Sequence, residues 1–443
     1  MSGQKPREIA ARILGSAPVA GYVEDRFERA VADETLSPAD RRLCQELVYG
    51  AVRWQATLDW LIARKTAGRR QKLGLQNLLR LGLYQIFWLE RIPNHAAVHE
   101  TVELAKQLGF GPQAGFINAV LRGYLRESDA TRQALAELKH KEPAHGYSHP
   151  AWLFERWQKR WGPEPAAKLM DWNNTPPSMF ARINTLKADP GKLLAQWRDE
   201  NVDYDFFRRD WFEENVVFEL KSHPPLARLP SFQQGQFYIQ DPSTLLAVQV
   251  LAPNPGQTVL DLCAAPGGKL TYIAQLMRNE GRLVAQDLSP ERINLIKQNC
   301  ARLDVVLAEV QVTKTTSLDS PSLPASPKQS TAMYDRVLVD APCSNTGVLR
   351  RRVDLRWRLR AEEIERLRSN QLSLLRRAAE TVKPAGALVY STCSLEQEEN
   401  QGVVNEFLSG NKDFHLELQR ELVPFREGVD GAYVARLVRN RIA

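Results

Sequence analysis

Two cysteines follow strand-like apolar runs in the second half of the chain. Cys343 stands in VDAPCSNTG, residues 339–347, and Cys393 stands in YSTCSLEQEEN, residues 390–400. In an α/β protein the loops after parallel strands gather at the carboxyl edge of the sheet, where functional groups lie. The whole chain has only five cysteines. Two thiols at such an edge predict covalent chemistry on a substrate that has to be activated before it reacts.

Cytosine C5 is a substrate of this kind, because it is too weak a nucleophile to take a methyl group directly. A thiolate that adds to C6 turns the ring into an enamine, in which C5 becomes nucleophilic. After methyl transfer a base has to remove the C5 proton, and the thiol has to leave. A hydrogen-bond donor on the N3 side of the base would stabilise the adduct. The residues alone do not decide which cysteine attacks.

A cofactor turn is predicted in TVLDLCAAPGGKLTYIAQL, residues 258–276, which reads as strand, glycine turn and helix. The start of the helix offers free N–H groups and the positive end of the helix dipole. Gly267 and Gly268 let a ligand approach the backbone closely. Asp287 ends the next strand about 20 residues later, the usual place of a carboxylate that binds ribose hydroxyls.

The turn matches neither of the two common nucleotide-binding motifs. It lacks the G-x-G-x-x-G of dinucleotide folds and the G-x-x-x-x-G-K-[ST] of phosphate loops. A nucleoside without a pyrophosphate remains, and S-adenosylmethionine fits that description. The alternative is an α/β domain with a tight turn that holds no ligand.

Length, composition and charge limit the number of domains and the classes of protein that the sequence can represent. A chain of 443 residues predicts two or three domains, and 43% hydrophobic with 25% charged residues is typical of globular proteins. The net charge of +7 is compatible with a polyanionic partner. There is no apolar stretch of about 20 residues and no signal sequence, which favours a cytoplasmic protein without a membrane span. No C-x-x-C pair occurs, so no metal site is predicted, and Cys44 and Cys300 are expected to be packing residues.

The pattern of apolar residues predicts three domains. Residues 1–146 have helical periodicity with short connections, which indicates a bundle. Residues 147–232 alternate strand and helix patterns and form a small α/β module. Residues 233–443 contain four short apolar runs separated by helical patterns, typical of a doubly wound parallel sheet. The Ser, Thr and Pro-rich residues 313–331 are predicted to be an exposed inserted loop.

The motifs DLCAAPGGK, DAPCSNTG and STCSLEQEEN together resemble those of the RNA cytosine-C5 methyltransferase family. RLGLYQIFWLERIPNHAAVHETVELAK and GFINAVLR resemble the NusB-type RNA-binding helical domain, which points to the bacterial 16S rRNA branch of the family, RsmB or Sun/Fmu. The resemblance covers nearly the whole chain. It implies an all-α NusB-like bundle, a small α/β module similar to RRM or ferredoxin folds, and a Rossmann-like domain that uses S-adenosylmethionine.

The resemblance also implies roles for individual residues. Cys393 would attack C6, Cys343 would assist release of the product, and Asp340 would contact the cofactor amine and the edge of the base. Asp287 would bind the ribose. The family commonly has an acidic residue near the adenine where this chain has Thr313, and this departure leaves the adenine contact unassigned. The residues expected around the methionine part of the cofactor are Cys263, Ala264, Ala265, Pro266, Gly267, Gly268 and Lys269.

The expected substrate is a cytosine of 16S rRNA, for which the family's usual target is cytosine 967. GVLRRRVDLRWRLR, residues 347–360, follows Cys343 and could neutralise phosphates and stack Trp357 on a base. The alternative for this segment is a solvated helix face. The target base has to leave its stack, which favours a loop or a single strand. The rival functions are the same chemistry on tRNA and an RNA-binding scaffold without catalysis. We expect a monomer.

Overall fold

The computed structural model describes residues 5–16, 21–32, 34–312 and 333–441. Thr313 and the predicted inserted loop, residues 313–331, lie outside these ranges. The described chain divides into two compact units. The first contains the residues up to Pro176 together with Leu349–Leu359, and the second contains Pro177–Val348 and the residues from Arg360 onward. The predicted boundaries of three domains, after residues 146 and 232, stay a prediction.

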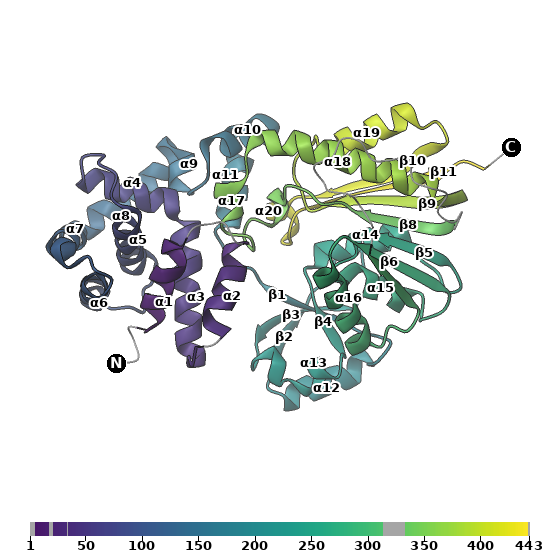
Figure 1. Ribbon diagram of the computed structural model, residues 1–443, viewed down its shortest axis with the longest axis horizontal. Coiled ribbons are helices and arrows are strands. Elements are labelled where there is room, and N and C mark those ends of the chain that lie inside the picture. Colours follow the sequence, from purple (N-terminus) through teal and green to yellow (C-terminus); the bar gives the residue numbers. More distant parts are fainter. Residues whose placement is uncertain (1–4, 17–20, 33, 313–332, 442–443) are drawn as a thin grey trace. The chain divides into compact units, whose positions relative to one another are not determined.

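The first unit is helical (Figure 1). Its core is built from one face of most helices and from nearly the whole circumference of α5, which is rich in leucine. The start of α3 has a capping residue, because the Ser37 hydroxyl accepts a hydrogen bond from the Asp40 backbone N–H. The helices are α1 (Lys5–Gly15), α2 (Val23–Ala32), α3 (Pro38–Arg53), α4 (Gln55–Lys65), α5 (Leu73–Trp88), α6 (Asn94–Gln107), α7 (Ala114–Arg126), α8 (Ser128–Lys141), α9 (Pro143–Gly146), α10 (Ala151–Trp161), α11 (Pro163–Asn173) and, from the later segment, α17 (Leu355–Arg358).

The second unit begins with a four-stranded antiparallel sheet in the order β2-β3-β1-β4. Its strands are β1 (Met179–Ile183), β2 (Asp203–Phe206), β3 (Val217–Ser222) and β4 (Phe237–Ile239). Helix α12 (Pro190–Asp199) begins after Asp189, whose carboxylate accepts from the Lys192 backbone N–H. Trp197 of this helix is fully buried against Phe218 and Phe237 of the sheet. The small α/β module predicted from the sequence is therefore present.

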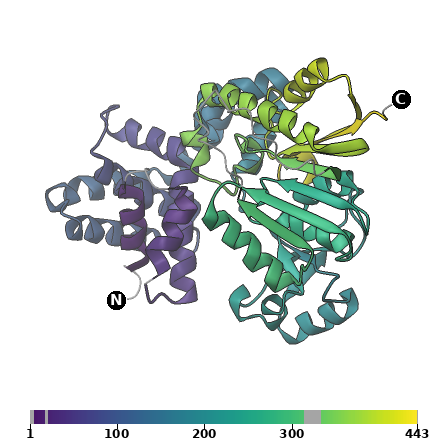
Figure 2. The same ribbon diagram turned by 45° about the vertical axis from the view of Figure 1, so that its right-hand side comes forward.

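A seven-stranded sheet follows in the order β10-β11-β9-β8-β5-β6-β7. The strands β7, β6, β5, β8 and β9 are parallel, and β11 and β10 add an antiparallel end that the four predicted apolar runs did not include. The turned view in Figure 2 shows these strands side by side, coloured teal to yellow. Their bounds are β5 (Thr258–Leu262), β6 (Arg282–Asp287), β7 (Ala308–Val312), β8 (Tyr334–Asp340), β9 (Val382–Thr392), β10 (Phe414–Leu422) and β11 (Ala432–Arg439).

Helices cover both faces of the large sheet, as expected for a doubly wound fold, because its parallel strands are buried on both sides. In Figure 1, α18 and α19 lie above the sheet and α14, α15 and α16 lie below it. Along β8, Val337 and Val339 face α18 and α19, while Leu338 faces the other layer. The helices are α13 (Pro230–Gln233), α14 (Leu245–Leu251), α15 (Gly268–Leu276), α16 (Pro290–Leu303), α18 (Ala361–Glu380), α19 (Gln401–Gly410) and α20 (Pro424–Glu427).

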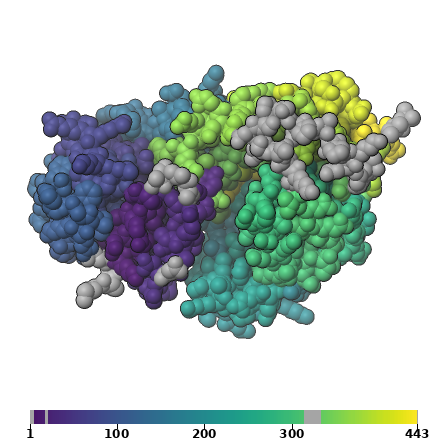
Figure 3. Space-filling view, viewed as in Figure 1, coloured from purple at the N-terminus to yellow at the C-terminus, as the bar shows by residue number. Residues whose placement is uncertain are grey.

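The outer face of α18 is polar. Ile364 and Leu375 are buried, whereas Glu362 and Glu365 are exposed. The green and yellow atoms of α18 and α19 form part of the surface in the space-filling view (Figure 3). No helix within the described ranges is both long and apolar enough to cross a lipid bilayer.

Candidate active site

The two strand-end cysteines lie together. Cys343 Sγ and Cys393 Sγ are 3.3 Å apart. The register of the sheet explains this, because Asp340 at the end of β8 is paired with Ser391 of β9, so the loops that follow start side by side. The Ala341 backbone N–H also donates to the Ser391 carbonyl at 2.9 Å, which extends the ladder beyond the end of β8. Cys343 is buried and Cys393 is half-buried.

Asn345 connects the Cys393 thiol to the backbone of Cys343. The Cys393 thiol donates to Asn345 Oδ1 with an Sγ–Oδ1 distance of 2.9 Å, and Asn345 Nδ2 donates to the Cys343 carbonyl at 2.8 Å. The backbone of Asn345 has φ of +58°, in the left-handed region that asparagine and glycine adopt more readily than other residues. Sequence reasoning missed Asn345, although it stands two residues after a cysteine in a motif that was singled out.

A buried carboxylate joins the two cysteine loops. Glu399 accepts from the Ser344 backbone N–H at 2.8 Å and from Gln371 Nε2 of α18 at 2.9 Å. It also accepts from the hydroxyls of Ser344 and Ser394, the residues that follow the two cysteines. Burial raises the pKa of Glu399, and these donors act against that rise. Sequence reasoning missed Glu399; its only signal was a run of acidic residues directly after the second cysteine.

Two glycines let the loops pack backbone against backbone. A Cβ atom on Gly347 would lie 2.7 Å from the Cys393 carbonyl oxygen and 2.8 Å from Gly431 Cα. The Gly347 N–H donates to the Cys393 carbonyl at 2.9 Å, and the Gly431 N–H donates to the Gly347 carbonyl at 2.8 Å. A side chain at either glycine would push the loop of Cys343 away from the loop of Cys393.

The two thiols have unequal surroundings. The hydrogen bond to Cys393, burial and the nearby Glu399 carboxylate all raise the pKa of Cys343, so Cys343 keeps its proton at neutral pH. A cation lies near Cys393: although burial acts to lower the pKa of Lys269, the Asp340 carboxylate and then Cys393 raise it. Lys269 therefore stays charged beside Asp340 and Cys393.

Asp340 anchors that ammonium group. Lys269 Nζ lies 2.6 Å from Asp340 Oδ2, and the Ser391 hydroxyl donates to Asp340 Oδ1 at 2.8 Å. Lys269 comes from the first turn of α15, Asp340 from the end of β8, and Ser391 from β9. The predicted cofactor turn and the two predicted cysteine loops thus share one connected polar network.

Asp287 holds the cofactor turn. Its carboxylate accepts from the backbone N–H groups of Ala265 at 3.0 Å and Leu288 at 2.7 Å, and Arg292 Nε lies 3.3 Å from it. Only 1% of the Asp287 side chain is exposed. Gly267, which precedes α15, has φ of +102°, a conformation that requires glycine. The predicted contact of Asp287 with ribose hydroxyls stays a prediction.

The residues of this turn fit an amino-acid nucleoside. Both carboxylate oxygens of Asp261, at the end of β5, are buried without a hydrogen-bond partner within the described part of the chain. Burial, with the Asp340 carboxylate second, raises the pKa of Asp261 well above its ordinary value. An amine would supply the missing donor, the free N–H groups at the start of α15 suit a carboxylate, and acidic side chains suit ribose hydroxyls.

Two arginines of the segment after the first cysteine are buried and do not belong to the predicted RNA-binding surface. Arg356 is fully buried, and its guanidinium donates to the carbonyls of Ser148 at 3.1 Å and Asn173 at 2.9 Å, and to Asn174 Oδ1 at 2.8 Å. Arg350 is also buried, with its guanidinium 4.3 Å from the centre of the Trp172 ring.

Trp357 of the same segment is likewise bound to the helical unit. Its Nε1 donates to the Val52 carbonyl at 2.7 Å, and its half-buried ring packs against the core of that unit. Val353 is fully buried in the same core. Both predictions for the segment, an RNA surface and a solvated helix face, are wrong for Arg350 and Arg356, and the stacking role of Trp357 stays a prediction. The physical reason is that apolar residues alternate with the arginines and carry the segment into a core.

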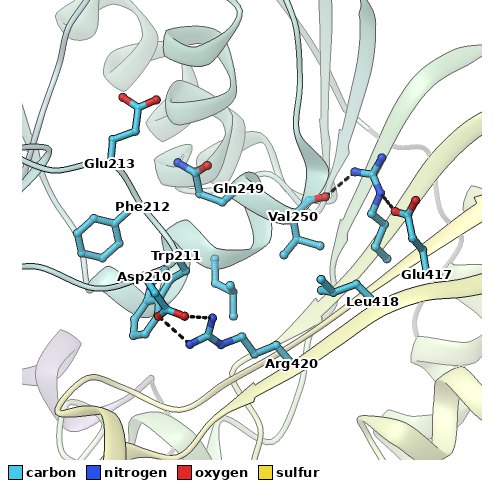
Figure 4. A pocket seen from close by; sticks show the side chains of 11 residues that line it. Asp210, Trp211, Phe212, Glu213, Gln249, Val250, Glu417, Leu418 and Arg420 are labelled. Atoms are coloured by element: carbon cyan, nitrogen blue, oxygen red, sulfur yellow. Dashed lines mark hydrogen bonds and ion pairs between the residues drawn. The ribbon is translucent and has the colours of Figure 1, made fainter.

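A cavity of about 660 Å³ lies in another part of the second unit (Figure 4). Trp211 and Leu418 line it, and Arg420 forms a two-point ion pair with Asp210 at 2.8 and 2.9 Å. The guanidinium of Arg420 also lies 4.9 Å from the centre of the Trp211 ring. Both arginines that line it are paired with carboxylates, Arg420 with Asp210 and Arg436 with Glu417, and none of the predicted site residues lines it.

Family models cover most of the chain. The model described as 16S rRNA methyltransferase RsmB/F matches residues 248–438, the NusB family matches residues 4–126, and the RsmF/B-like ferredoxin-like domain matches residues 149–217. These matches confirm the predicted fold class: a NusB-like helical bundle, a ferredoxin-like module and a methyltransferase domain. They also agree with the elements that the structure places in each range.

Similar proteins extend the match to the whole chain. The chain is 37% identical over 397 residues to the "Probable ribosomal RNA small subunit methyltransferase B" of Bacillus subtilis, which covers 89% of this chain and 86% of that protein. The crystal structure of PH0851 has a TM-score of 0.74 at 24% identity and covers 98% of both chains. The structure of NSun6 from Pyrococcus horikoshii with SFG has a TM-score of 0.56 at 22% identity, and covers 66% of this chain and 99% of that one. The last two show the likeness of fold.

Proposed function

The chain belongs to the RsmB/F family of 16S rRNA methyltransferases, and we propose that it methylates C5 of a cytosine in 16S rRNA through a covalent bond from Cys393 to C6. The observation that carries the proposal is the pair of thiols 3.3 Å apart with unequal surroundings. A scaffold that only binds RNA needs neither thiol, and this speaks against that alternative.

The family uses S-adenosylmethionine, which supplies an electrophilic methyl group when it is bound. In this chain the residues of the turn at 263–269 would hold its methionine part. Asp261 would accept from the amine, and Asp287 would face the ribose while it keeps the turn in place. Asp340 would lie between the cofactor and the base. Each Asp340 oxygen accepts one bond in the structure, which leaves a second lone pair for the amine of the cofactor or of the base.

Cys393 is the thiol suited to attack. It is half-buried, so a base that has left its stack can reach it, and the charged Lys269 lies near it. The thiolate forms a bond to C6, and the electron pair of the C5–C6 double bond becomes available at C5, where the methyl group is received. The sulfur then carries no charge, and the positive Lys269 remains paired with Asp340.

Cys343 is suited to the release of the product. Its raised pKa keeps Cys343 a neutral thiol, which can donate its proton to the departing Cys393 sulfur and take the C5 proton in exchange. Loss of this proton restores the C5–C6 double bond, and the electron pair of the C6–S bond returns to Cys393. The distance of 3.3 Å between the sulfur atoms supports this order, since a group beside the nucleophile also lies beside the carbon next to the attacked one.

A covalent trap tests the proposal. Wild type, Cys343→Ala and Cys393→Ala are incubated with S-adenosylmethionine and a 16S rRNA transcript, and a protein–RNA adduct is sought on a denaturing gel. We expect the adduct to build up in Cys343→Ala and to be absent in Cys393→Ala. An adduct in Cys393→Ala and none in Cys343→Ala would mean that Cys343 attacks C6 and Cys393 assists release of the product.

The substrate needs a separate measurement. Transfer of labelled methyl groups to the 16S rRNA transcript, to the same transcript with cytosine 967 replaced by uridine, and to bulk tRNA separates the possible targets. We expect label on the first RNA only. Label on tRNA alone would overturn the ribosomal substrate, and equal label on both transcripts would move the target to another cytosine.

A further inference from the structure

We propose that Asn345 is a positioning residue for Cys393: its amide fixes the direction of the Cys393 thiol proton and has to turn over when that thiol ionises. The proposal rests on the proposed function only in naming Cys393 as the nucleophile. It is carried by the two hydrogen bonds of the Asn345 side chain, one to each cysteine, and by the backbone conformation of Asn345.

The three residues form a closed ring of hydrogen bonds. Asn345 Nδ2 donates to the Cys343 carbonyl at 2.8 Å, and this bond fixes the amide with its oxygen toward Cys393. Cys393 has one proton, which it donates to Asn345 Oδ1 at 2.9 Å. The contact of 3.3 Å between the sulfur atoms is then left for the Cys343 proton to make. The direction of every bond in the ring follows from the single proton of each thiol.

The ring fits a neutral Cys393 and conflicts with a charged one. A thiolate can only accept hydrogen bonds, so a carbonyl oxygen 2.9 Å away would oppose the negative charge. If the side-chain amide of Asn345 turns by about 180°, its N–H group donates to the thiolate. The turned amide gives up its bond to the Cys343 carbonyl. The amide therefore exists in two orientations, one for each protonation state of Cys393.

The other groups near Cys393 do not have to change from acceptor to donor when Cys393 loses its proton. Lys269 on the cofactor turn brings a positive charge near Cys393, and the Asp340 carboxylate pairs with that charge. Cys343 on the neighbouring loop donates a proton to either form. Glu399 lies behind Ser344 and Ser394 and reaches the thiols through these residues. Among these neighbours, only the Asn345 amide presents a carbonyl oxygen to Cys393 and carries an N–H donor that could take its place.

The left-handed backbone of Asn345 makes a clean set of variants available. With φ of +58°, glycine keeps the turn and removes the amide, so Asn345→Gly separates the side chain from the backbone. Asn345→Asp has the same shape but offers only acceptors when it is ionised, and it cannot turn a donor toward the thiolate. Asn215 has φ of +61° on an exposed turn, so Asn215→Asp and Asn215→Gly are matched controls.

The experiment measures the rate of alkylation of Cys393 by iodoacetamide against pH, in the full chain without RNA or cofactor. Peptide mass spectrometry reads Cys393 and Cys343 separately. We expect Asn345→Asp to move the midpoint of the Cys393 profile to higher pH by about one unit, a tenfold lower rate near neutral pH. Asn345→Gly should leave the Cys393 midpoint below that of Asn345→Asp. Both Asn215 variants should follow wild type.

Profiles that coincide for wild type and Asn345→Asp would overturn the proposal. An equal shift in Asn345→Asp and Asn345→Gly would do so as well, since it would mean that only the loss of the amide matters and that its orientation does not. The readout needs neither methyl transfer nor an RNA adduct. A failure of the proposed function would therefore leave this measurement intact, and a failure here would leave the covalent trap intact.

Discussion

Glu399 and Arg356 are both buried ionisable residues whose hydrogen bonds go to neutral groups, and they lie in different units of the molecule. Burying a charge is costly unless hydrogen bonds replace the lost water. Glu399 receives side-chain hydroxyl, amide and backbone donors from residues beside the two cysteines. Arg356 donates mainly to backbone carbonyls, one of them Asn173 at the end of α11, where a cation is favoured.

A buried charge that is held by hydrogen bonds to neutral groups can therefore serve two purposes. Around Glu399 the charge gathers loops whose geometry matters for chemistry. Around Arg356 it attaches a segment from far along the chain to a helical core. Removing Arg356 should therefore affect stability, whereas removing Glu399 should affect reactivity as well. The following predictions test this division.

The largest expected effect on stability is that of Arg356→Met. The change leaves three buried acceptors without donors, each worth about 1–3 kcal/mol, and removes the cost of burying a cation. We expect a net loss of about 3 kcal/mol in the free energy of unfolding of the helical unit, measured by urea denaturation with tryptophan fluorescence. Arg70→Met, at an exposed position of the same unit, is the control and should change little. A loss of similar size in Arg70→Met would contradict the assignment.

Glu399→Ala should combine a moderate loss of stability with a large loss of methyl transfer. It leaves the Ser344 N–H without an acceptor and Gln371 Nε2 with the Pro342 carbonyl alone, at about 2 kcal/mol, and frees the loops that hold the two thiols. Displacement of reacting groups by about 1 Å can cost a hundredfold in rate. Glu399→Gln keeps the oxygen that serves these two donors, and its N–H group can donate to the serine hydroxyls. Methyl transfer close to wild type in Glu399→Ala would refute the positioning role.

The pH dependence of stability separates the charge of Glu399 from its shape. Burial raises its pKa in the folded protein above that in the unfolded chain, so the folded state binds the proton more tightly. This contribution is complete below the unfolded pKa and is lost as the pH rises through the folded pKa, at up to about 1.4 kcal/mol per pH unit. Glu399→Gln has no carboxyl group at this position and therefore lacks this pH-dependent contribution to stability. Its free energy of unfolding minus that of wild type should rise with pH in that window, and a flat difference would contradict the burial.

The smallest effect is expected for Trp357→Phe. The change removes the hydrogen bond from Trp357 Nε1 to the Val52 carbonyl and keeps most of the ring in place. A single hydrogen bond of this kind contributes about 1 kcal/mol. Urea denaturation of the helical unit should show a loss of that size, with RNA binding unchanged at constant salt. A large loss of RNA affinity without a loss of stability would support the stacking role that the sequence predicted for Trp357.

The sequence was informative where local patterns decide the outcome. The loops of Cys343 and Cys393 were expected at one edge of a sheet, because parallel strands end together, and their sulfur atoms are in contact. The roles of these cysteines stay a prediction. Glu399 and Asn345 could not be assigned, because their importance depends on which side chains surround them after folding.

The arginine-rich segment was misjudged because composition was given more weight than pattern. Leu349, Val353, Leu355 and Leu359 are all buried, and they alternate with the arginines. The antiparallel end of the large sheet was also missed. The sequence of β10, FHLELQREL, carries apolar residues mostly at alternate positions, and that of β11, AYVARLVR, is a short, mostly apolar run; both are signals of strands that the four predicted runs did not use.

The helical unit takes its last piece from residues 349–359, far along the chain. During synthesis the ribosome makes the first 176 residues, then 172 residues of the other unit, and only then the segment that carries the buried Val353 and Trp357. Strands β9, β10 and β11 come later still. The nascent helical unit therefore lacks residues 349–359, and the apolar surface that they cover stays exposed while β5 to β8 are synthesised. A ribosome that stalls between residues 177 and 348 leaves this surface exposed to chaperones and proteases.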